Sequence, residues 1–210
     1  MTIRDILAIA TPVMPVIVID DIEHAVPMAE ALRDGGVTVL EITLRTDAAL
    51  GAMRAISKAL PDVIVGAGTV FNETQLKQAE DAGARFAVSP GLTEKLARAA
   101  QHSSVALLPG AVTASEIQLA LEHGYETLKF FPAEAAGGAP VLKALHGPFR
   151  QIRFCPTGGI SVTNAANYLN LPNVACVGGS WLTPAAEMKA GNWPALTALA
   201  RESRLLGRQK

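Results

Sequence analysis

The sequence predicts an α/β fold built as a single (β/α)8 barrel of the TIM type, spanning residues 1–210, with a short N-terminal helix. Three observations lead to it. Strand-like and helix-like stretches alternate along the whole chain. The strand-like stretches are continuous apolar runs, as parallel strands buried on both faces are. About eight such pairs follow one another without a shift in composition that would mark a second domain. An open doubly wound sheet is the alternative.

The first half of the chain opens with an amphipathic segment and then alternates between the two patterns, with glycine or proline between them. The strands expected here are residues 13–19, 37–44, 63–69 and 85–89. The helices expected here are residues 22–33, 47–60, 73–82 and 93–101.

The second half continues the alternation. Its expected strands are residues 105–108, 126–131, 152–155 and 174–177, and its expected helices are residues 115–122, 162–169 and 194–206. Parallel strands joined by helices bring all their carboxyl ends to one face, where barrel active sites form.

Composition excludes several classes of protein. The chain is 50% hydrophobic and 18% charged, which argues against disorder, and its net charge of −1 gives no electrostatic reason to expect nucleic acid or an anionic membrane as a partner. No apolar run reaches membrane-spanning length, and the N-terminus lacks the pattern of a signal peptide. We therefore expect a cytoplasmic protein. Cys155 and Cys176 lie in apolar runs and are expected to act as small hydrophobes, although a disulfide between them stays open.

Lys129 is the most unusual residue of an expected strand, because Leu128, Phe130 and Phe131 surround it in the sequence. Burial disfavours the charged form of an amine, and a neutral amine is a nucleophile. Lys129 is therefore a candidate for Schiff-base chemistry with a carbonyl substrate. The alternative is an edge-strand lysine, or one whose head group reaches solvent.

Glu41, Thr43 and Arg45 occupy alternate positions at the end of the second expected strand, so their side chains should project to one side. A Glu41–Arg45 salt bridge that closes the barrel is one reading. Thr69 and Lys129 also lie near strand ends, however, and together these groups suit a keto acid. An amine would attack the ketone, a guanidinium would hold the carboxylate, and a carboxylate would move protons.

Glycines beside hydroxyl groups follow the seventh and eighth expected strands. Thr157, Gly158 and Gly159 follow one, and Gly179 and Ser180 follow the other. Loops at these two places of a barrel often bind phosphate through backbone N–H groups, and glycine lets the backbone approach the anion closely. The sequence therefore predicts a substrate with phosphate at one end and a keto acid at the other.

The histidines do not suggest a metal site. They fall on expected helices or connecting loops without ligand spacing, so we expect solvated surface positions for His24, His102, His123 and His146. Phe131 and Trp181 lie near the expected pocket mouth, where they either shield it or pack in the ordinary way.

Several motifs resemble bacterial 2-keto-3-deoxy-6-phosphogluconate (KDPG) aldolases of the Entner–Doudoroff pathway, and the resemblance covers nearly the whole chain. The motifs are the segments 39–46 (VLEITLRT), 65–70 (VGAGTV), 89–92 (SPGL), 129–134 (KFFPAE), 153–160 (RFCPTGGI) and 178–182 (GGSWL). The resemblance implies a class I aldolase that uses neither metal nor external cofactor and assembles as a homotrimer. It also implies cleavage of KDPG to pyruvate and glyceraldehyde 3-phosphate, and often of 4-hydroxy-2-oxoglutarate to pyruvate and glyoxylate.

The resemblance also implies roles for individual residues. Lys129 would be the Schiff-base lysine and Glu41 the general acid/base. The expected substrate-binding residues are Arg45 and Thr69 for the carboxylate, Pro90 and Phe131 for the shape of the pocket, and Gly158, Gly159, Gly179 and Ser180 for the phosphate. Ala136, where relatives often have a polar residue, and the charged C-terminal tail are departures that bear on substrate choice or assembly.

Three other functions remain open at this stage. One is a relative that acts on the galactonate epimer of the same substrate, which these pocket residues do not distinguish. Another is a phosphate-binding isomerase or epimerase in which Glu41 is the base and Lys129 an electrostatic aid. The last is a sugar-phosphate binding module without catalysis.

Overall fold

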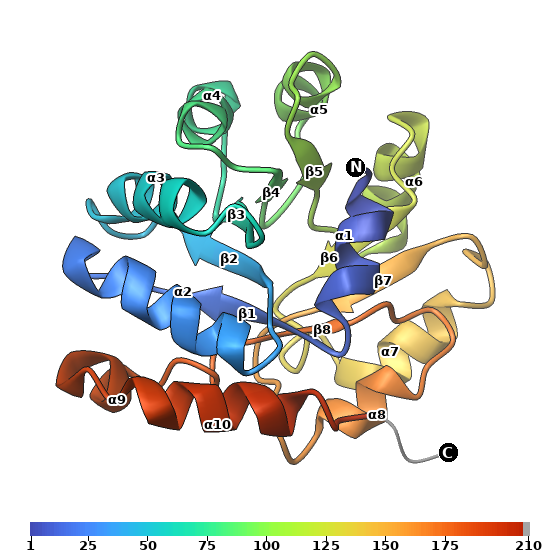
Figure 1. The fold of residues 1–210 in the computed structure, drawn as a ribbon. Coiled ribbons are helices and arrows are strands. Elements are labelled where there is room, and N and C mark those ends of the chain that lie inside the picture. Colours follow the sequence, from blue (N-terminus) through green and yellow to red (C-terminus); the bar gives the residue numbers. More distant parts are fainter. Residues whose placement is uncertain (208–210) are drawn as a thin grey trace.

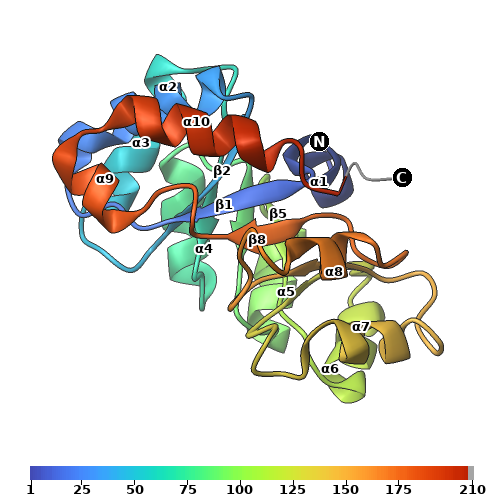
Figure 2. The same ribbon diagram turned by 90° about the horizontal axis from the view of Figure 1, so that it is seen from below.

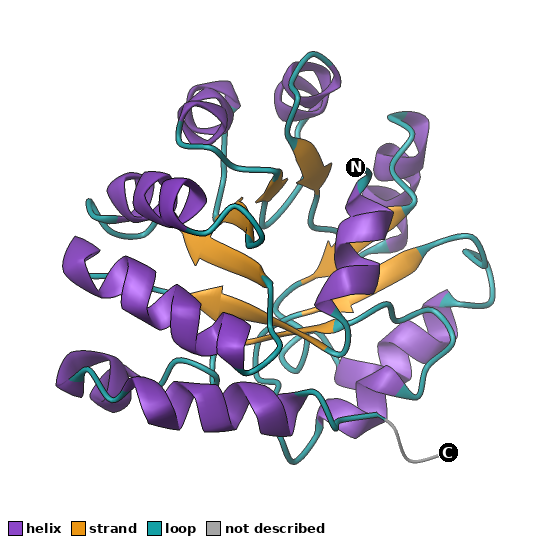
Figure 3. Cartoon of the chain, in the orientation of Figure 1, coloured by secondary structure: helices purple, strands orange, loops and turns teal. Residues whose placement is uncertain are grey.

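The computed structural model describes residues 1–207 and places the strands at the centre, with helices around them (Figures 1 and 3). The last residues of the charged C-terminal tail, 208–210, lie outside the described residues. The alternation of strand and helix expected from the sequence is confirmed, and it forms an α/β fold in which the paired strands are parallel.

Six strands form one parallel sheet in the order β5-β4-β3-β2-β1-β8, and β6 pairs with β7 in a second sheet. Single parallel bridges, Gly110 with Lys129 and Thr157 with Gly178, link the segment after β5 to β6 and the segment after β7 to β8. The strands are β1 (Val13–Ile17), β2 (Val39–Thr43), β3 (Ile64–Gly68), β4 (Phe86–Val88), β5 (Ala106–Leu108), β6 (Thr127–Phe130), β7 (Arg153–Pro156) and β8 (Val177–Gly179).

The last strand lies further along the chain than its apolar run suggested. Residues 174–177 were expected, but Val174 makes only a single bridge to Phe154 of β7, and the ladder with β1 begins at Val177. Two glycines, Gly178 and Gly179, complete that ladder. Strand propensity disfavours glycine, so the sequence pattern missed positions that the neighbouring strand holds in place.

Most helices lie where the apolar spacing predicted them, and the 3-10 turn Ile22–His24 leads into the second. The sequence pattern missed α7 and α9, because the glycines and prolines at their N-termini also signal turns. The helices are α1 (Ile3–Ala10), α2 (Ala25–Asp34), α3 (Ala49–Ala59), α4 (Glu73–Asp81), α5 (Glu94–Gln101), α6 (Ala114–Glu122), α7 (Gly138–Leu145), α8 (Ala165–Leu169), α9 (Ala185–Ala190) and α10 (Trp193–Ser203).

The core has two parts. The larger part lies between the strands and the surrounding helices. The smaller lies among the strands, where Phe86, Val88 and Leu108 meet Cys155 and Cys176. Helix α1 adds its buried Ile6 and Leu7 to this inner cluster and so closes the amino-terminal end of the strands. The opposite end remains available for the polar residues of the site.

Helix α10 runs beside α2 and joins the two ends of the chain (Figure 2). The Thr197 hydroxyl donates to the carbonyl oxygen of Ala31 over 2.9 Å. Gly35 permits the close approach, since a Cβ at this position would lie 2.4 Å from Cβ of Ala200. Within residues 1–207, none of these helices combines the length and the apolar character that crossing a bilayer requires.

Candidate active site

Lys129 lies within β6, and backbone pairing holds it on both sides. Its N–H donates to the carbonyl of Pro109 over 2.8 Å, its carbonyl accepts from the N–H of Ala111 over 2.9 Å, and its register partner on β7 is Cys155. The side chain points among the strands and is only 6% exposed. The alternatives of an edge lysine and of a head group in solvent do not describe this residue.

Glu41 of β2 supplies the partner for the buried amine. Its side chain is 1% exposed, and Oε1 lies 3.4 Å from Nζ of Lys129. The second oxygen, Oε2, is buried and accepts no hydrogen bond from residues 1–207. A buried acceptor without a partner is costly, so it suits a proton or hydroxyl that arrives with a ligand.

The two other polar residues expected at the end of β2, Thr43 and Arg45, have different hydrogen-bond partners. The Thr43 hydroxyl donates to the carbonyl of Ile17 over 2.9 Å, so β1 already satisfies it. Arg45 lies beyond the end of β2 and is exposed, and its Nε donates to Oγ1 of Thr69 over 3.2 Å. The interpretation of Glu41 and Arg45 as a salt bridge is therefore wrong, because Glu41 pairs with Lys129 and Arg45 with Thr69.

Thr69 has an unusual backbone conformation for its type, with a φ of 63° directly after β3. A β-branched residue with positive φ is strained, and such strain is maintained by the surrounding structure. The conformation places the Thr69 hydroxyl against the guanidinium of Arg45, which orients that side chain at the rim.

Phe131 and Pro90 lie near the amine on different segments, Phe131 directly after β6, the strand of Lys129 itself, and Pro90 after β4. Nζ of Lys129 lies 5.2 Å from the centre of the Phe131 ring. The carbonyl of Pro90 packs against Gly110, where a Cβ would lie only 2.1 Å from the carbonyl oxygen, and Gly110 itself bridges to Lys129. Phe131 therefore contacts the amine from the end of its own strand, and Pro90 reaches the surroundings of the amine through Gly110.

The turn after β7 has a left-handed backbone, which its glycines adopt without strain, and vacant N–H donors. Gly158 and Gly159 have φ values of 100° and 76°, a region that favours glycine. No hydrogen bond within residues 1–207 uses their N–H groups. Successive free amides in such a turn form a concavity suited to an anion. Thr157, before them, packs against Gly178 of β8, where a Cβ would meet its Oγ1 at 2.2 Å.

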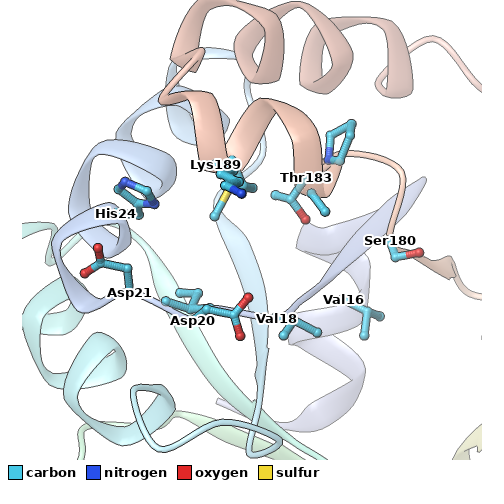
Figure 4. Close-up of a pocket in the computed structure, with 12 residues that line it drawn as sticks. Val16, Val18, Asp20, Asp21, His24, Ser180, Thr183 and Lys189 are labelled. Carbon is cyan, nitrogen blue, oxygen red and sulfur yellow. The ribbon is translucent and has the colours of Figure 1, made fainter.

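Gly179 and Ser180 end β8 beside this turn. A Cβ on Gly179 would lie 2.0 Å from the Trp181 ring, so the ring covers the strand end closely. Ser180 is exposed and also borders a cavity of about 790 Å³ between the segment after β1 and helix α9. Figure 4 shows Ser180 at one edge of this cavity, with Val18, Asp20 and Lys189 further along it.

Neither Lys129 nor Glu41 lines this cavity. The amine and its carboxylate are too enclosed by strands to border a wide opening. The facing charged groups of Lys129 and Glu41, and not the size of the cavity, indicate the candidate active site. Ser180 connects the two regions, because it follows the same strand whose glycines face Thr157.

The structure brings to the site two contacts that were left open or not predicted, one between the two cysteines and one between a tyrosine and a glutamate. Cys155 and Cys176 are free and lie 3.6 Å apart, sulfur to sulfur, in the inner core. The hydrogen bond to Cys155 and burial together raise the pKa of the Cys176 thiol. The Tyr168 hydroxyl donates to Glu134 in the loop after β6. Only the alternation of side chains along β6 and β7 could have suggested that Cys155 lies beside Lys129.

The expected surface positions of the histidines need correction in two cases. Nδ1 of His146 is buried and unpaired at the end of α7, and the His24 ring packs edge-on against Trp193 with the ring centres 5.4 Å apart. Both side chains keep part of their surface exposed, and these contacts were missed because α10 is distant in sequence from His24 and α7 was not expected. Among residues 1–207, no three His, Cys, Asp or Glu side chains gather closely enough to hold a metal ion.

Comparison with known proteins gives a family. Residues 3–199 match the aldolase family described as KDPG and KHG aldolase. The KHG/KDPG aldolase of Escherichia coli K12 is 56% identical over 192 residues, which cover 91% of this chain and 90% of the relative.

Two solved structures are also close. The Legionella pneumophila KDPG aldolase, with pyruvate captured at low pH as a covalent carbinolamine intermediate, has a TM-score of 0.92 at 50% identity, covering 94% of this chain and 96% of that one. The aldolase of Zymomonas mobilis ZM4 with 3-phosphoglycerate also has a TM-score of 0.92 at 50% identity, covering 98% and 97%. This chain therefore belongs to the KDPG and KHG aldolase family.

Proposed function

We propose that this protein is a class I aldolase that cleaves KDPG to pyruvate and glyceraldehyde 3-phosphate, and 4-hydroxy-2-oxoglutarate to pyruvate and glyoxylate. The observation that carries the proposal is the buried pair of Lys129 Nζ and Glu41 Oε1, 3.4 Å apart. The family shown by the comparisons and the carbinolamine trapped in the Legionella relative support it.

The reaction follows from this pair. Glu41 accepts a proton from the ammonium of Lys129, and the neutral amine attacks the C2 ketone to give a carbinolamine. Proton transfer from Glu41 to the hydroxyl lets water leave and gives an iminium. When a base removes the C4 hydroxyl proton, the C3–C4 bond breaks, its electron pair moves into an enamine, and the aldehyde departs. Protonation at C3 and hydrolysis release pyruvate and free the amine. The vacant Oε2 of Glu41 suits these transfers.

The remaining residues would hold the two ends of the substrate. Arg45, oriented by Thr69, would bind the carboxylate. The free amides of Gly158 and Gly159, with Gly179 and Ser180 across from them, would bind the phosphate. Thr157 precedes Gly158 and faces Gly178 of β8, so it lies between the two glycine segments and would also contact the substrate. Phe131 and Pro90 would shape the pocket around the bound ketone.

We further propose that the two sheets act as one closed eight-stranded barrel forming a single domain, and that three copies assemble into a homotrimer. The single bridges between β5 and β6 and between β7 and β8 support closure. The trimer follows from family membership. Light scattering should give a mass of about three chains. If the protein is a monomer at the concentration of the assay, the trimer proposal fails and the proposed reaction is unaffected.

Reductive trapping tests the mechanism directly. Borohydride added with pyruvate should leave a pyruvate-derived adduct on Lys129, located by peptide mass analysis. Lys143, an exposed lysine on α7, is the internal control and should remain unmodified. Absence of the adduct would contradict the aldolase and leave an isomerase with Glu41 as its base.

Variants separate the roles of the pair and of the phosphate site. Lys129→Ala should abolish cleavage, whereas Glu41→Gln should slow it and still permit some trapping. Ser180→Ala should raise KM for KDPG more than for 4-hydroxy-2-oxoglutarate, which lacks phosphate. An equal rise in KM for both substrates would contradict a role of Ser180 in phosphate binding.

A further inference from the structure

The contact between Tyr168 and Glu134, which the proposed function does not use, bears on the Gly158–Gly159 turn. Glu134 lies in the loop between β6 and α7, and its backbone N–H donates to the carbonyl of Gly158 over 3.1 Å. The preceding residue, Ala133, donates in the same way to Thr157 over 2.8 Å. The loop that follows the lysine strand therefore holds the turn by its backbone.

The side chain of Glu134 also lies across the turn. A Cβ placed on Gly159 would be 2.6 Å from Cγ of Glu134, so its methylene groups cover that glycine. A carboxylate this close to vacant amides can itself become their ligand, since the amides of such a turn attract any anion. The position of the carboxylate therefore matters for whether a substrate anion finds the amides vacant.

Tyr168 sets that position. It lies on α8, is almost fully buried, and donates its hydroxyl to Oε1 of Glu134. Burial and this hydrogen bond raise the pKa of the phenol, so the hydroxyl keeps its proton and remains a donor. The bond holds the carboxylate toward α8.

The opposite side of the turn is held from the same helix region. Nδ2 of Asn164 donates to the carbonyl of Gly159 over 3.0 Å, and its Oδ1 accepts from the N–H of Ser161 over 2.8 Å. Of the side chains that contact Gly159, Glu134 is therefore the one that carries a negative charge, and Tyr168 is its hydrogen-bond donor.

We infer that Tyr168 is a positioning residue that holds Glu134 across the Gly158–Gly159 turn and keeps the amides of that turn open to the phosphate group of the substrate. The inference rests on the proposed function and extends it to two residues that do not bind the substrate. It assigns the pair to selectivity for phosphorylated over unphosphorylated keto acids, and not to the Schiff-base steps.

The test compares two substrates in Tyr168→Phe. The change removes one hydroxyl and leaves the ring in place. KM for KDPG should rise about fivefold, the weight of one lost hydrogen bond, while KM for 4-hydroxy-2-oxoglutarate and both kcat values change less than about twofold. Inorganic phosphate, used as an inhibitor of 4-hydroxy-2-oxoglutarate cleavage, should bind more weakly by the same factor.

Tyr125→Phe is the matched control. Tyr125 is also partly buried, and its hydroxyl faces the carbonyl of Ala97 on α5 at 3.5 Å, in another part of the molecule. This variant should leave the ratio of the two KM values unchanged. An equal change on both substrates in Tyr168→Phe, or none, would overturn the positioning role.

A double-mutant cycle tests whether the two residues act together. Glu134→Gln keeps an oxygen that can accept from Tyr168 but removes the charge that could occupy the amides. Tyr168→Phe should therefore cost less KDPG affinity in the Glu134→Gln background than in the native protein. Losses that add would show independent effects and contradict the inference. Reductive trapping of Lys129 in each variant distinguishes this failure from a failure of the aldolase, since trapping needs no phosphate.

Discussion

Glu41 keeps its carboxylate beside Lys129 because Gly68, on the neighbouring strand β3, has no side chain. A Cβ at Gly68 would lie 2.4 Å from Oε1 and 2.8 Å from Cγ of Glu41. Both glutamate and lysine are buried, so neither has space into which it can retreat. The absence of a side chain at Gly68 therefore sets the distance between Glu41 and Lys129, on which proton transfer depends.

We predict that Gly68→Ala lowers kcat at least tenfold, because displacement of a catalytic group by about 1 Å costs up to about a hundredfold in rate. Steady-state cleavage of KDPG measures this. Gly147→Ala is the control, since a Cβ there meets only the carbonyl of Ala144 at 3.4 Å. A Gly68→Ala enzyme with normal kcat would mean that Glu41 tolerates other positions.

Thr69 combines strain with a function at the level of a single residue. Replacement by glycine should relieve its positive φ and raise the free energy of unfolding by about 0.5–1 kcal/mol, after the larger entropy of an unfolded glycine is subtracted. KM for KDPG should rise several-fold, because Arg45 loses its hydroxyl partner. Urea unfolding and kinetics measure the two effects. Thr69→Ser, which keeps the hydroxyl, should keep the KM. A less stable glycine variant would contradict the strain.

Among the elements, α6 shows how local sequence determines a helix. Thr113 and Glu116 form a capping box, in which the Thr113 hydroxyl accepts from the Glu116 amide and Glu116 accepts from the Thr113 amide over 2.7 Å. The hydrogen bond from the Thr113 amide lowers the pKa of Glu116 despite partial desolvation, and the Val112 amide adds to the effect. All of these partners lie within four residues, so the sequence alone could predict them.

The pH dependence of Glu116 follows from the sign of this shift. A carboxyl group with a lowered pKa in the folded state contributes stability above its unfolded pKa, and this contribution is lost as pH falls through the folded value. Glu116→Ala should therefore lower the free energy of unfolding by about 1 kcal/mol at neutral pH and by much less near pH 3.

Urea unfolding at the two pH values measures the Glu116 effect. Glu122→Ala, in the last turn of the same helix, is the control and should be neutral or slightly stabilising, because it removes a negative charge near the helix C-terminus. An undiminished Glu116→Ala difference at low pH would assign the loss to packing.

At the scale of the whole molecule, α10 returns to α2 and connects the C-terminal part of the chain to its beginning. Gly35 permits this contact, with a Cβ at that position only 2.4 Å from Ala200 and 2.8 Å from the carbonyl of Thr197. The carbonyl cannot rotate away as a side chain would, so the helices must separate if Gly35 gains a side chain.

Gly35→Ala should therefore destabilise the protein by about 1–3 kcal/mol, as overpacking does. Thermal and urea unfolding measure the loss. Gly91→Ala, where a Cβ meets nothing within 4 Å, should change stability by less than about 0.5 kcal/mol. Equal stabilities of Gly35→Ala and the native protein would show that α10 contributes little to the fold.

The sequence alone predicted the alternation of strands and helices and the apolar runs of most strands. It also determined the presence of a lysine within one of these strands, because side-chain type and local spacing suffice for such features. Local signals failed in β8, where pairing with a distant strand holds two glycines, and at α7 and α9, whose N-terminal glycines and prolines also signal turns. The motifs singled out Lys129 and Glu41, which the fold brings together, but did not predict all of the contacts around them.

Which strand ends meet depends on how the strands and helices pack together. Lys129 and Glu41 are 88 residues apart, Arg45 bonds to Thr69 and not to Glu41, and Tyr168 reaches Glu134 across two loops. Each partner depends on the order and register of the strands around the centre, which no segment encodes alone. The physical reason is that burial leaves each polar group only the partners that the packed strands bring within hydrogen-bond distance.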